Sequence, residues 1–398
     1  MRVGLLGCAV QESFGGVNYV LNLARALGAL PAGERPRITL FVDPWLPNQE
    51  AFEAIRPLAD EIAPLSGSAT TGQGPARRLV RILSRFAGGW AKAVLRAGRQ
   101  AGCEILFPTS VSLGRRDAQA GPAWIGWAYD LQHVHHPEFF SRADRWRRDY
   151  YFAGLARHAP RIVVSSAAAR ADWLRRYPGT EDRVRVLSFT CVPLEEWYAG
   201  PPEAVAQAHG LPPKFLILPN QFWIHKNHAT AFEAIRLLRE RGLDVTLVCT
   251  GATHDSRHPG HFEGLRGWIE HHGLADCIRI LGLLPAGEQM QLVRRAAALV
   301  QPSLFEGWST VVEEARALGK PIFLSDLPVH REQDPPGARF FPPRDAQALA
   351  DLIAAEWPAL APGSIPEQEA AARQAHAGRV ARYAETFVRV AREAMSAA

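Results

Sequence analysis

Short apolar runs rich in Val, Ile and Leu alternate with longer amphipathic stretches along almost the whole chain, and this pattern restricts the fold more than any other feature. Runs of this kind, apolar at every position, are typical of strands in parallel sheets that helices cover on both faces. The pattern therefore predicts an α/β protein with two series of strands. We expect the first series at 2–6, 38–42, 105–107, 124–127, 162–164 and 184–187, and the second at 215–218, 245–249, 278–281, 298–301 and 321–324.

The length of 398 residues also favours two domains, because a single core rarely organises more than about 250–300 residues. Between the two series of strands, the stretch PPEAVAQAHGLPP is rich in Ala, Gly and Pro and is typical of a linker. We predict a Rossmann-like N-terminal domain over 1–197, a linker over 198–213, a Rossmann-like C-terminal domain over 214–372, and a helix over 373–398 that packs back on the N-terminal domain. Ligands of doubly wound sheets bind outside the carboxyl ends of the strands.

Composition excludes several classes of protein. A hydrophobic content of 47% and a charged content of 21% are those of a folded globular chain, not of a disordered one. Apolar runs fall short of the ~18–20 residues that span a bilayer, and only seven residues precede Cys8, so we expect neither a transmembrane helix nor a secretory signal. The five cysteines are dispersed and form no C-x-x-C pair, so we expect reduced core thiols and a cytoplasmic protein.

The net charge of +5 is concentrated in the N-terminal half, where residues 1–200 carry 25 Lys and Arg against 18 Asp and Glu. Residues 75–101 contain seven of these basic residues, no acidic residue, and interleaved large apolar side chains. As a helix, this stretch would be basic and amphipathic, so an anionic membrane surface is one candidate partner and a solvated helix face is the alternative. No nucleic-acid-binding module accompanies the stretch, and we expect no nucleic-acid partner.

The segment PSLFEGWSTVVEEARALGKP, residues 302–321, has the features of a phosphate-binding helix start. Residues 307–310 predict a loop that leads into a helix over 311–318, which Gly319 ends. The free N–H groups and the positive dipole end of such a helix are suited to a diphosphate. Glu314 is placed to accept hydrogen bonds from both ribose hydroxyls, and Glu306, ahead of the loop, to hold a sugar hydroxyl. Two glutamates beside an ordinary helix start would share this pattern.

Two further strand-to-helix loops carry candidate binding residues. In ILPNQFWIHKNHATAFEAI, residues 217–235, Lys226 follows a predicted strand and is placed to neutralise a phosphate as a compact point charge. Gly15 and Gly16 follow the first predicted strand and precede a helix over 19–27, so the backbone there can approach a ligand closely. The glycines do not form G-x-G-x-x-G, which argues against a dinucleotide-dependent dehydrogenase.

A group of polar residues, WAYDLQHVHHPEFFS at 127–141, follows another predicted strand. Asp130, His133, His135 and His136 suggest a metal site, but helical i, i+4 spacing is absent and Pro137 breaks any helix. No Asp-x-Asp occurs in the chain, and metal-dependent sugar transferases use that pair for Mg²⁺ or Mn²⁺. We therefore predict neither a metal nor a cofactor. For His133, His135 and His136, a structural role in bracing the loop is the alternative to a catalytic role.

Together these segments resemble the retaining family 4 glycosyltransferases of the GT-B fold, which carry E-x7-E in a P-S-x-x-E-G-x-G-x-x-x-x-E-A setting. The resemblance covers nearly the whole chain and implies a diphosphate-binding Lys226 and a loop, around Asp130 and His133, that contacts the transferred sugar or the acceptor. The donor contacts that it implies are Gly15, Gly16, Gln221, Lys226, Gly307, Trp308, Ser309, Thr310 and Glu314, with Glu306 on the sugar.

Two positions depart from the family pattern. The family often has glycine where this chain has Ser309, which still offers a backbone N–H and a hydroxyl. The family commonly has arginine five residues before the lysine, where this chain has Gln221, a polar side chain that supplies no charge.

The resemblance implies a retaining transfer of a hexose-type sugar from a nucleotide diphosphate to a saccharide or lipid-linked acceptor, in cell-envelope polysaccharide synthesis, at the cytoplasmic face of a membrane. In this mechanism the acceptor attacks from the face that the diphosphate leaves, and no side chain acts as nucleophile. The alternatives are a nucleotide-sugar epimerase or hydrolase on the same fold, or a binding protein without activity.

Overall fold

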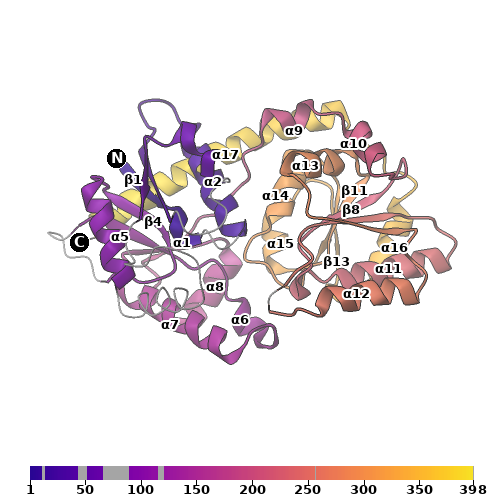
Figure 1. The fold of residues 1–398 in the computed structure, drawn as a ribbon, viewed down its shortest axis with the longest axis horizontal. Helices are drawn as coiled ribbons and strands as arrows, with labels where there is room; N and C mark the ends of the chain where they lie inside the picture. Colours follow the sequence, from indigo (N-terminus) through magenta and orange to yellow (C-terminus); the bar gives the residue numbers. More distant parts are fainter. Residues whose placement is uncertain (11–13, 44–51, 66–88, 115–120, 256, 398) are drawn as a thin grey trace. The chain divides into compact units, whose positions relative to one another are not determined.

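The computed structural model of the protein describes residues 1–10, 14–43, 52–65, 89–114, 121–255 and 257–397 (Figure 1). Contacts divide the chain into two compact units. Unit 1 comprises Met1–His135, Arg142–Val192 and Arg379–Ala398, and unit 2 comprises His136–Ser141 and Pro193–Gly378.

Unit 1 is built on a parallel sheet in which β1 lies near the middle. Leu5 of β1 pairs with Leu40 on one side and with Phe107 on the other, and all three side chains are buried. In sheet order the strands are β3 (Glu61–Pro64), β2 (Arg37–Val42), β1 (Arg2–Leu6), β4 (Ile105–Thr109), β5 (Ala123–Trp127), β6 (Arg161–Val164) and β7 (Val184–Val186).

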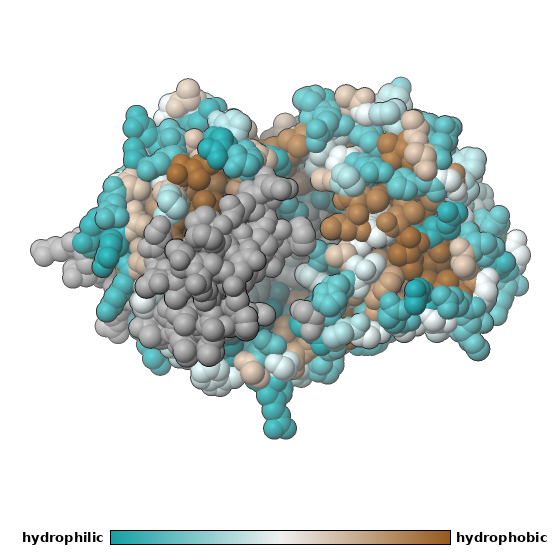
Figure 2. All heavy atoms as spheres, viewed as in Figure 1, coloured by the Kyte–Doolittle hydropathy of each residue, from teal (hydrophilic) through white to brown (hydrophobic). Residues whose placement is uncertain are grey.

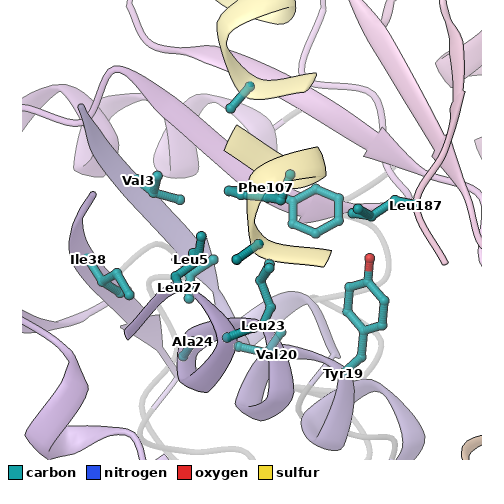
Figure 3. Packing of buried hydrophobic residues seen from close by; sticks show 14 of the residues in the cluster. Val3, Leu5, Tyr19, Val20, Leu23, Ala24, Leu27, Ile38, Phe107 and Leu187 are labelled. Carbon is teal, nitrogen blue, oxygen red and sulfur yellow. The ribbon is translucent and has the colours of Figure 1, made fainter. Parts of the chain in front are cut away.

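Helices cover both faces of this sheet. On one face, α2 and the last residues of α17 bury a common core in which Leu23, Phe107 and Phe387 take part (Figure 3). On the other face, a second core forms around Trp124, Phe152 and Trp173. The helices of unit 1 are α1 (Gly7–Val10), α2 (Phe14–Gly28), α5 (Gly89–Gln100), α6 (Gln132–His135), α7 (Arg142–His158), α8 (Ala167–Arg176) and the end of α17 (Pro366–Ser396).

Unit 2 repeats the architecture with a second parallel sheet. In sheet order its strands are β10 (Ile278–Gly282), β9 (Leu247–Thr250), β8 (Leu216–Pro219), β11 (Ala298–Gln301), β12 (Ile322–Ser325) and β13 (Ala338–Phe341). Its helices are α9 (Glu195–Ala199), α10 (Pro202–Ala208), α11 (His228–Glu240), α12 (His261–His271), α13 (Ala286–Arg295), α14 (Thr310–Ala317), α15 (Pro328–Gln333), α16 (Ala346–Glu356) and the start of α17.

The predicted α/β architecture with two doubly wound parallel sheets is confirmed. Two strands escaped prediction, and both lie at a sheet edge: β3 contains Glu61 and Pro64, and β13 contains Arg339. Edge strands are partly exposed, so they lack the continuous apolar run that marks the inner strands.

The stretch predicted as a linker, 198–213, contains α10, which packs along α13 within unit 2. Pro202 is the first residue of α10, a position where proline is compatible with a helix because the missing N–H would have no helical partner. The C-terminal helix is longer than predicted, and its residues from Arg379 onward group with unit 1.

The structure bears on the predictions for the basic stretch, the cysteines and membrane-spanning helices. Residues 75–88 of the basic stretch 75–101 lie outside the described residues, whereas Lys92, Arg96 and Arg99 are exposed on α5. All five cysteines are free and buried. In the part of the chain that the structure describes, no helix has the length and apolar character needed to cross a membrane. On the face of unit 2 that Figure 2 shows, hydrophobic residues gather in the middle with hydrophilic residues around them.

Candidate active site

The strand order of unit 2 places the candidate site. The chain runs from β8 to β9 and β10 in one direction across the sheet, and then returns to β11 on the other side of β8. The loops that follow β8 and β11 thus leave from neighbouring strands at the point where the order reverses, which is where doubly wound sheets bind ligands. These loops are 220–227 and 302–309, the two segments that carry Lys226 and Glu306.

Two contacts join these loops. Asn227 has a left-handed conformation, with φ of 56°, which asparagine tolerates better than most residues. Its side-chain Nδ2 donates to Pro302 O at 2.9 Å and to Pro343 O at 2.7 Å. The backbone N–H of Leu304 donates to His225 O at 2.8 Å. Lys226 is therefore held beside the Glu306 loop.

Lys226 and Glu306 form a direct ion pair in which Lys226 Nζ lies 2.7 Å from Glu306 Oε1. The side chain of Lys226 is 15% exposed and that of Glu306 is 8% exposed, so both remain reachable from solvent. The structure thus brings together two of the residues that the sequence singled out, which are 80 positions apart.

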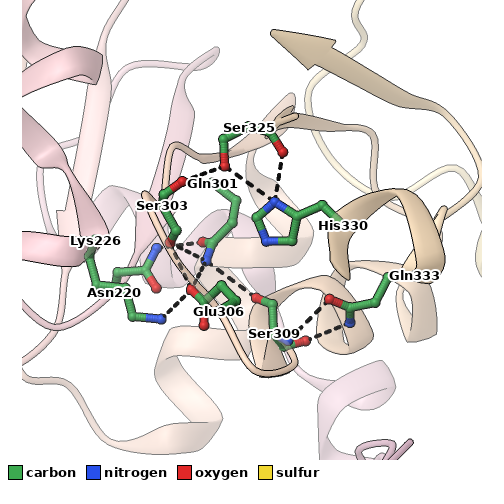
Figure 4. Close-up of polar contacts among 9 residues, drawn as sticks. All are labelled: Asn220, Lys226, Gln301, Ser303, Glu306, Ser309, Ser325, His330 and Gln333. Carbon is green, nitrogen blue, oxygen red and sulfur yellow. Dashed lines mark hydrogen bonds and ion pairs between the residues drawn. The ribbon is translucent and has the colours of Figure 1, made fainter. Parts of the chain in front are cut away.

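A buried amide organises the polar groups beneath this pair (Figure 4). Gln301, at the end of β11, accepts a hydrogen bond from Asn220 Nδ2 at 2.6 Å. Its Nε2 lies 3.0 Å from Glu306 Oε1 and 3.0 Å from Ser303 Oγ, and Ser303 Oγ donates to the same carboxylate oxygen at 2.7 Å. Oε1 of Glu306 therefore receives three hydrogen bonds, which fix the orientation of the carboxylate.

Helix α14 begins at Thr310 and has Ser309 as its N-cap, but the Ser309 side chain does not cap the helix. The Ser309 hydroxyl instead lies 3.3 Å from Gln301 Nε2. The N–H groups in the first turn of a helix have no carbonyl of that helix to bind. The start of α14 therefore presents uncapped N–H donors and a positive dipole end next to Lys226.

One expectation for this loop is corrected. We expected the Ser309 backbone N–H to be open to a ligand, but it donates to Gln333 Oε1 at 3.1 Å. Gln333 Nε2 donates in return to Ser309 O at 3.0 Å and to Glu313 Oε1 at 3.1 Å. The side-chain amide of Gln333 thus pairs with both backbone groups of Ser309, and the open donors begin at Thr310.

The two adjacent glutamates of α14 have different surroundings. Glu313 is fully buried and is bonded to Gln333, with Arg316 Nε 3.9 Å away, which indicates a structural role. Burial raises the pKa of Glu314 to about 7, and the positive charge of Lys226 opposes this rise. The charge of Lys226 therefore affects the ionisation of Glu314, as expected if both residues bind the same donor molecule.

Behind the site, Ser325 and His330 connect β12 to the loop after β11. Ser325 Oγ donates to Ser303 O at 2.7 Å, and His330 Nδ1 donates to Ser325 O at 2.8 Å. Burial lowers the pKa of His330, which favours the neutral ring. The remaining motif residues lie where the sequence placed them: Gly307 and Trp308 precede α14, with Trp308 buried, and Gln221 lies in the Lys226 loop, partly exposed.

Sequence reasoning missed six residues of this network: Asn220, Gln301, Ser303, Ser325, His330 and Gln333. A signal was present for Asn220 and Gln301, since each is a polar residue at the carboxyl end of an otherwise apolar strand. His330 and Gln333 lie on α15, whose sequence carries no sign that it faces this loop.

In unit 1 the candidate residues near α6 have separate partners. Asp130 Oδ1 accepts from Gln132 N at 3.0 Å and from Arg148 Nη1 at 2.9 Å. His133 is buried with its Nε2 3.4 Å from Asp149, and burial, more than the charge of Arg148, lowers its pKa.

The other two histidines of this segment also have carboxylate partners of their own. His135 Nε2 lies 2.7 Å from Asp172, and His136 Nδ1 lies 3.0 Å from Glu138. His136 groups with unit 2, where His258 donates to Phe139 O at 3.2 Å. Across the described ranges, no three of His, Cys, Asp and Glu converge on one point.

The glycine pair near the N-terminus requires another correction. Gly15 and Gly16 lie in the first turn of α2 and not in a loop before it. A Cβ on Gly16 would come within 2.7 Å of Val10 Cβ, so this glycine allows α1 and α2 to pack closely. The absence of a side chain at Gly16 thus permits the packing of α1 against α2, whereas Gly15 is exposed.

Comparison with known proteins shows which family part of this chain resembles. Residues 203–355 match the family model described as "Glycosyl transferases group 1". No protein of curated function matches the sequence. The match covers most of unit 2, including the loops that carry Lys226 and Glu306.

Solved structures extend the likeness to the whole chain. Sucrose-phosphate synthase from Thermosynechococcus elongatus is similar with a TM-score of 0.71 and 17% identity over 100% of both chains. HepE from Anabaena, solved with UDP-glucose, has a TM-score of 0.67 and 16% identity over 97% of this chain and 99% of its own. WaaG, a glycosyltransferase involved in lipopolysaccharide biosynthesis, has a TM-score of 0.60 and 14% identity over 99% and 98%. The chain has the GT-B fold of these enzymes.

Proposed function

We propose that the protein is a retaining glycosyltransferase that transfers a hexose-type sugar from a nucleoside diphosphate to a saccharide or lipid-linked saccharide acceptor. The observation that carries this proposal is the uncapped start of α14 beside the Lys226–Glu306 pair, at the switch point of unit 2. The group 1 family match over the same region supports it.

The donor occupies the loops after β8 and β11. The N–H groups from Thr310 onward and the ammonium of Lys226 bind the diphosphate, and Gln221 adds a neutral contact. Glu314 accepts hydrogen bonds from the ribose hydroxyls, and Glu306 accepts one from the sugar. Because HepE was solved with UDP and with UDP-glucose, UDP-glucose is the first donor to test.

The reaction breaks the bond between the anomeric carbon and the β-phosphate oxygen. An acceptor hydroxyl attacks that carbon from the face that the diphosphate leaves, and its proton passes to the departing phosphate oxygen. Lys226 and the first turn of α14 stabilise the charge that develops on the leaving group, a contribution of about 3–4 kcal/mol for one such donor in other enzymes. No metal and no covalent enzyme intermediate takes part.

The acceptor side belongs to the N-terminal half, where Asp130 and His133 are the candidate contacts. The likeness to WaaG, a glycosyltransferase involved in lipopolysaccharide biosynthesis, supports an acceptor in cell-envelope polysaccharide synthesis. The reaction would then take place at the cytoplasmic face of the membrane. Anionic vesicles test the membrane part of this proposal: protein that stays wholly in solution at low salt would argue against it.

The first experiment is a thermal-shift screen against UDP-, GDP-, ADP- and TDP-sugars. A ligand that binds only the folded protein raises its stability, by about 2.7 kcal/mol at one hundred times its dissociation constant. The nucleotide that binds is then used for transfer, and the anomeric configuration of the product is read by NMR. Inversion would contradict the mechanism, and rapid donor hydrolysis or epimerisation without acceptor would favour the other enzyme classes.

Lys226→Ala and Glu306→Ala test the site itself. Each change should lower kcat/KM by about 10²–10³-fold, because it removes a charge that binds the leaving group or the sugar. Circular dichroism should show an unchanged fold, and Glu263→Ala on exposed α12 serves as the matched control. Near-normal turnover in either site variant would exclude the assignment.

A further inference from the structure

The described residues of the loop after β9, 251–255 and 257–260, include a segment that lies beside the Lys226 loop. Phe222 N donates to Ala252 O at 3.0 Å. Gly251 has φ of 130°, and a Cβ there would lie 2.3 Å from Asn220 O, so only glycine allows the two backbones to come this close. The two loops therefore present their side chains to the same edge of the sheet.

Arg257 of this loop reaches Trp223, three residues before Lys226. Its guanidinium carbon lies 5.2 Å from the centre of the Trp223 ring, a distance at which a cation is attracted to the ring face. Trp223 in turn accepts the backbone N–H of Lys226 at 2.9 Å through its carbonyl oxygen. The position of Arg257 is thus coupled to the loop that carries Lys226.

A buried carboxylate fixes the orientation of Arg257. Asp255 Oδ1 accepts from Arg257 Nε at 3.2 Å, and Asp255 Oδ2 accepts from Arg257 Nη2 at 3.4 Å. The Asp255 side chain is 3% exposed and that of Arg257 is 26% exposed. One edge of the guanidinium is therefore anchored, while Nη1 has no hydrogen-bond partner among the described residues.

Electrostatic coupling runs from Asp255 towards Lys226. Burial lowers the pKa of His261 and the charge of Asp255 opposes that shift. Burial, with smaller contributions from His261 and Lys226, lowers the pKa of His228 to about 3. Asp255 thus acts on His261, and His261 and Lys226 act on His228, where His228 and His261 are the first residues of α11 and α12.

We propose that Arg257 supplies the second positive charge of the diphosphate site, the charge that Gln221 does not provide. Its free Nη1 edge donates charge-assisted hydrogen bonds to the distal phosphate of a nucleoside diphosphate, while Lys226 neutralises the same group from the other loop. This inference rests on the proposed function and deepens it, since it names the residue that recognises the second phosphate.

The test compares binding of a nucleoside diphosphate with that of its monophosphate. The wild-type protein is screened by calorimetry with UDP, GDP, ADP and dTDP, and the nucleotide that binds is measured again with Arg257→Gln. The dissociation constant of the diphosphate should rise about 10–100-fold, the loss expected for a hydrogen bond to a charged group, whereas that of the monophosphate should change less than about threefold.

Two further variants keep the test independent of folding. Asp255→Asn with Arg257→Gln removes both charges, so no buried carboxylate is left unpaired, and it should show the same selective loss. Gln221→Arg in the Arg257→Gln background should restore most of the diphosphate affinity by placing the charge on the neighbouring loop. Arg266→Gln, an exposed arginine of α12 paired with Glu263, is the control and should bind as the wild type does.

The outcomes separate this inference from the proposed function. If the wild type binds a nucleoside diphosphate and Arg257→Gln binds it equally well, Arg257 is not a phosphate ligand and the proposed function stands. An equal loss for monophosphate and diphosphate also overturns the inference. If the wild type binds none of the four nucleotides, the proposed function and this inference both fail.

Discussion

At the scale of single residues, the site is a set of charges whose states depend on one another. Lys226 pairs with Glu306 at 2.7 Å and also lowers the otherwise raised pKa of Glu314. One ammonium therefore balances two carboxyl groups when the donor is absent. A diphosphate that binds Lys226 competes with both carboxyl groups for the ammonium charge. The protonation of Glu314 is therefore coupled to donor binding.

Donor affinity should depend on pH through Glu314. Its pKa is about 7, so the carboxyl is largely protonated at pH 6 and largely ionised at pH 8. The ionised form accepts hydrogen bonds from both ribose hydroxyls, so the dissociation constant of the nucleoside diphosphate sugar should fall about tenfold from pH 6 to pH 8, a change of about 1.4 kcal/mol. Calorimetry with the sugar nucleotide measures this, because its diphosphate does not titrate in the range.

The variant Glu314→Gln removes the titrating group and should abolish this pH dependence. Stability should respond in the opposite sense: since the folded pKa lies above the ordinary value of 4.5, the Glu314 contribution to folding is lost as pH rises through about 7. A Glu314→Gln protein whose donor affinity still follows pH would show that another group is responsible.

At the scale of elements, the start of α14 is shaped by a helix that follows it in the chain. Gln333, the last residue of α15, holds both backbone groups of Ser309, and Ser309 in turn leaves α14 uncapped. The anion-binding end of α14 is therefore organised before any donor arrives.

Gln333→Ala should loosen this loop. It leaves the buried Ser309 N–H unpaired, at a cost of about 1–3 kcal/mol in stability, and it lowers kcat/KM because the first turn of α14 is no longer held in place. Thermal unfolding and steady-state kinetics measure the two effects. The control Gln347→Ala, on the exposed face of α16, should change neither; unchanged kinetics in Gln333→Ala would remove the positioning role.

At the scale of the whole molecule, the core of unit 1 combines segments that lie far apart in the chain. Val380, Tyr383 and Phe387 of α17 lie in the core of unit 1, although they follow all of unit 2 in the sequence. Unit 1 therefore cannot complete its core without α17.

Phe387→Ala should destabilise unit 1 by about 3–5 kcal/mol, because it empties a fully buried position in the core shared by α2, β4 and α17. Calorimetric melting with and without donor tests this: donor should raise the transition of unit 2 in both proteins, while the transition of unit 1 should be lower in the variant. Glu385→Ala, exposed on the same helix, is the control. Equal melting of both variants would show that α17 is dispensable for unit 1.

The sequence by itself determined the α/β class, eleven of the strands, and the loops in which Lys226, Glu306 and Glu314 lie. It could do so because each of these features is local: a buried parallel strand is apolar at every position, and binding residues follow such strands at their carboxyl ends. The edge strands β3 and β13 lack a continuous apolar pattern, because one side of each is open to solvent.

The tertiary structure alone decided which groups of these loops are open to a ligand. Gln333 accepts the hydrogen bond of the Ser309 N–H, and Val10 leaves no room for a side chain at Gly16. Gln301 orients Glu306, and Asp255 orients Arg257 beside Trp223. Most of these pairs join separate elements of the chain, so their geometry follows from the packing of helices and loops around the sheets and not from any periodicity of the sequence.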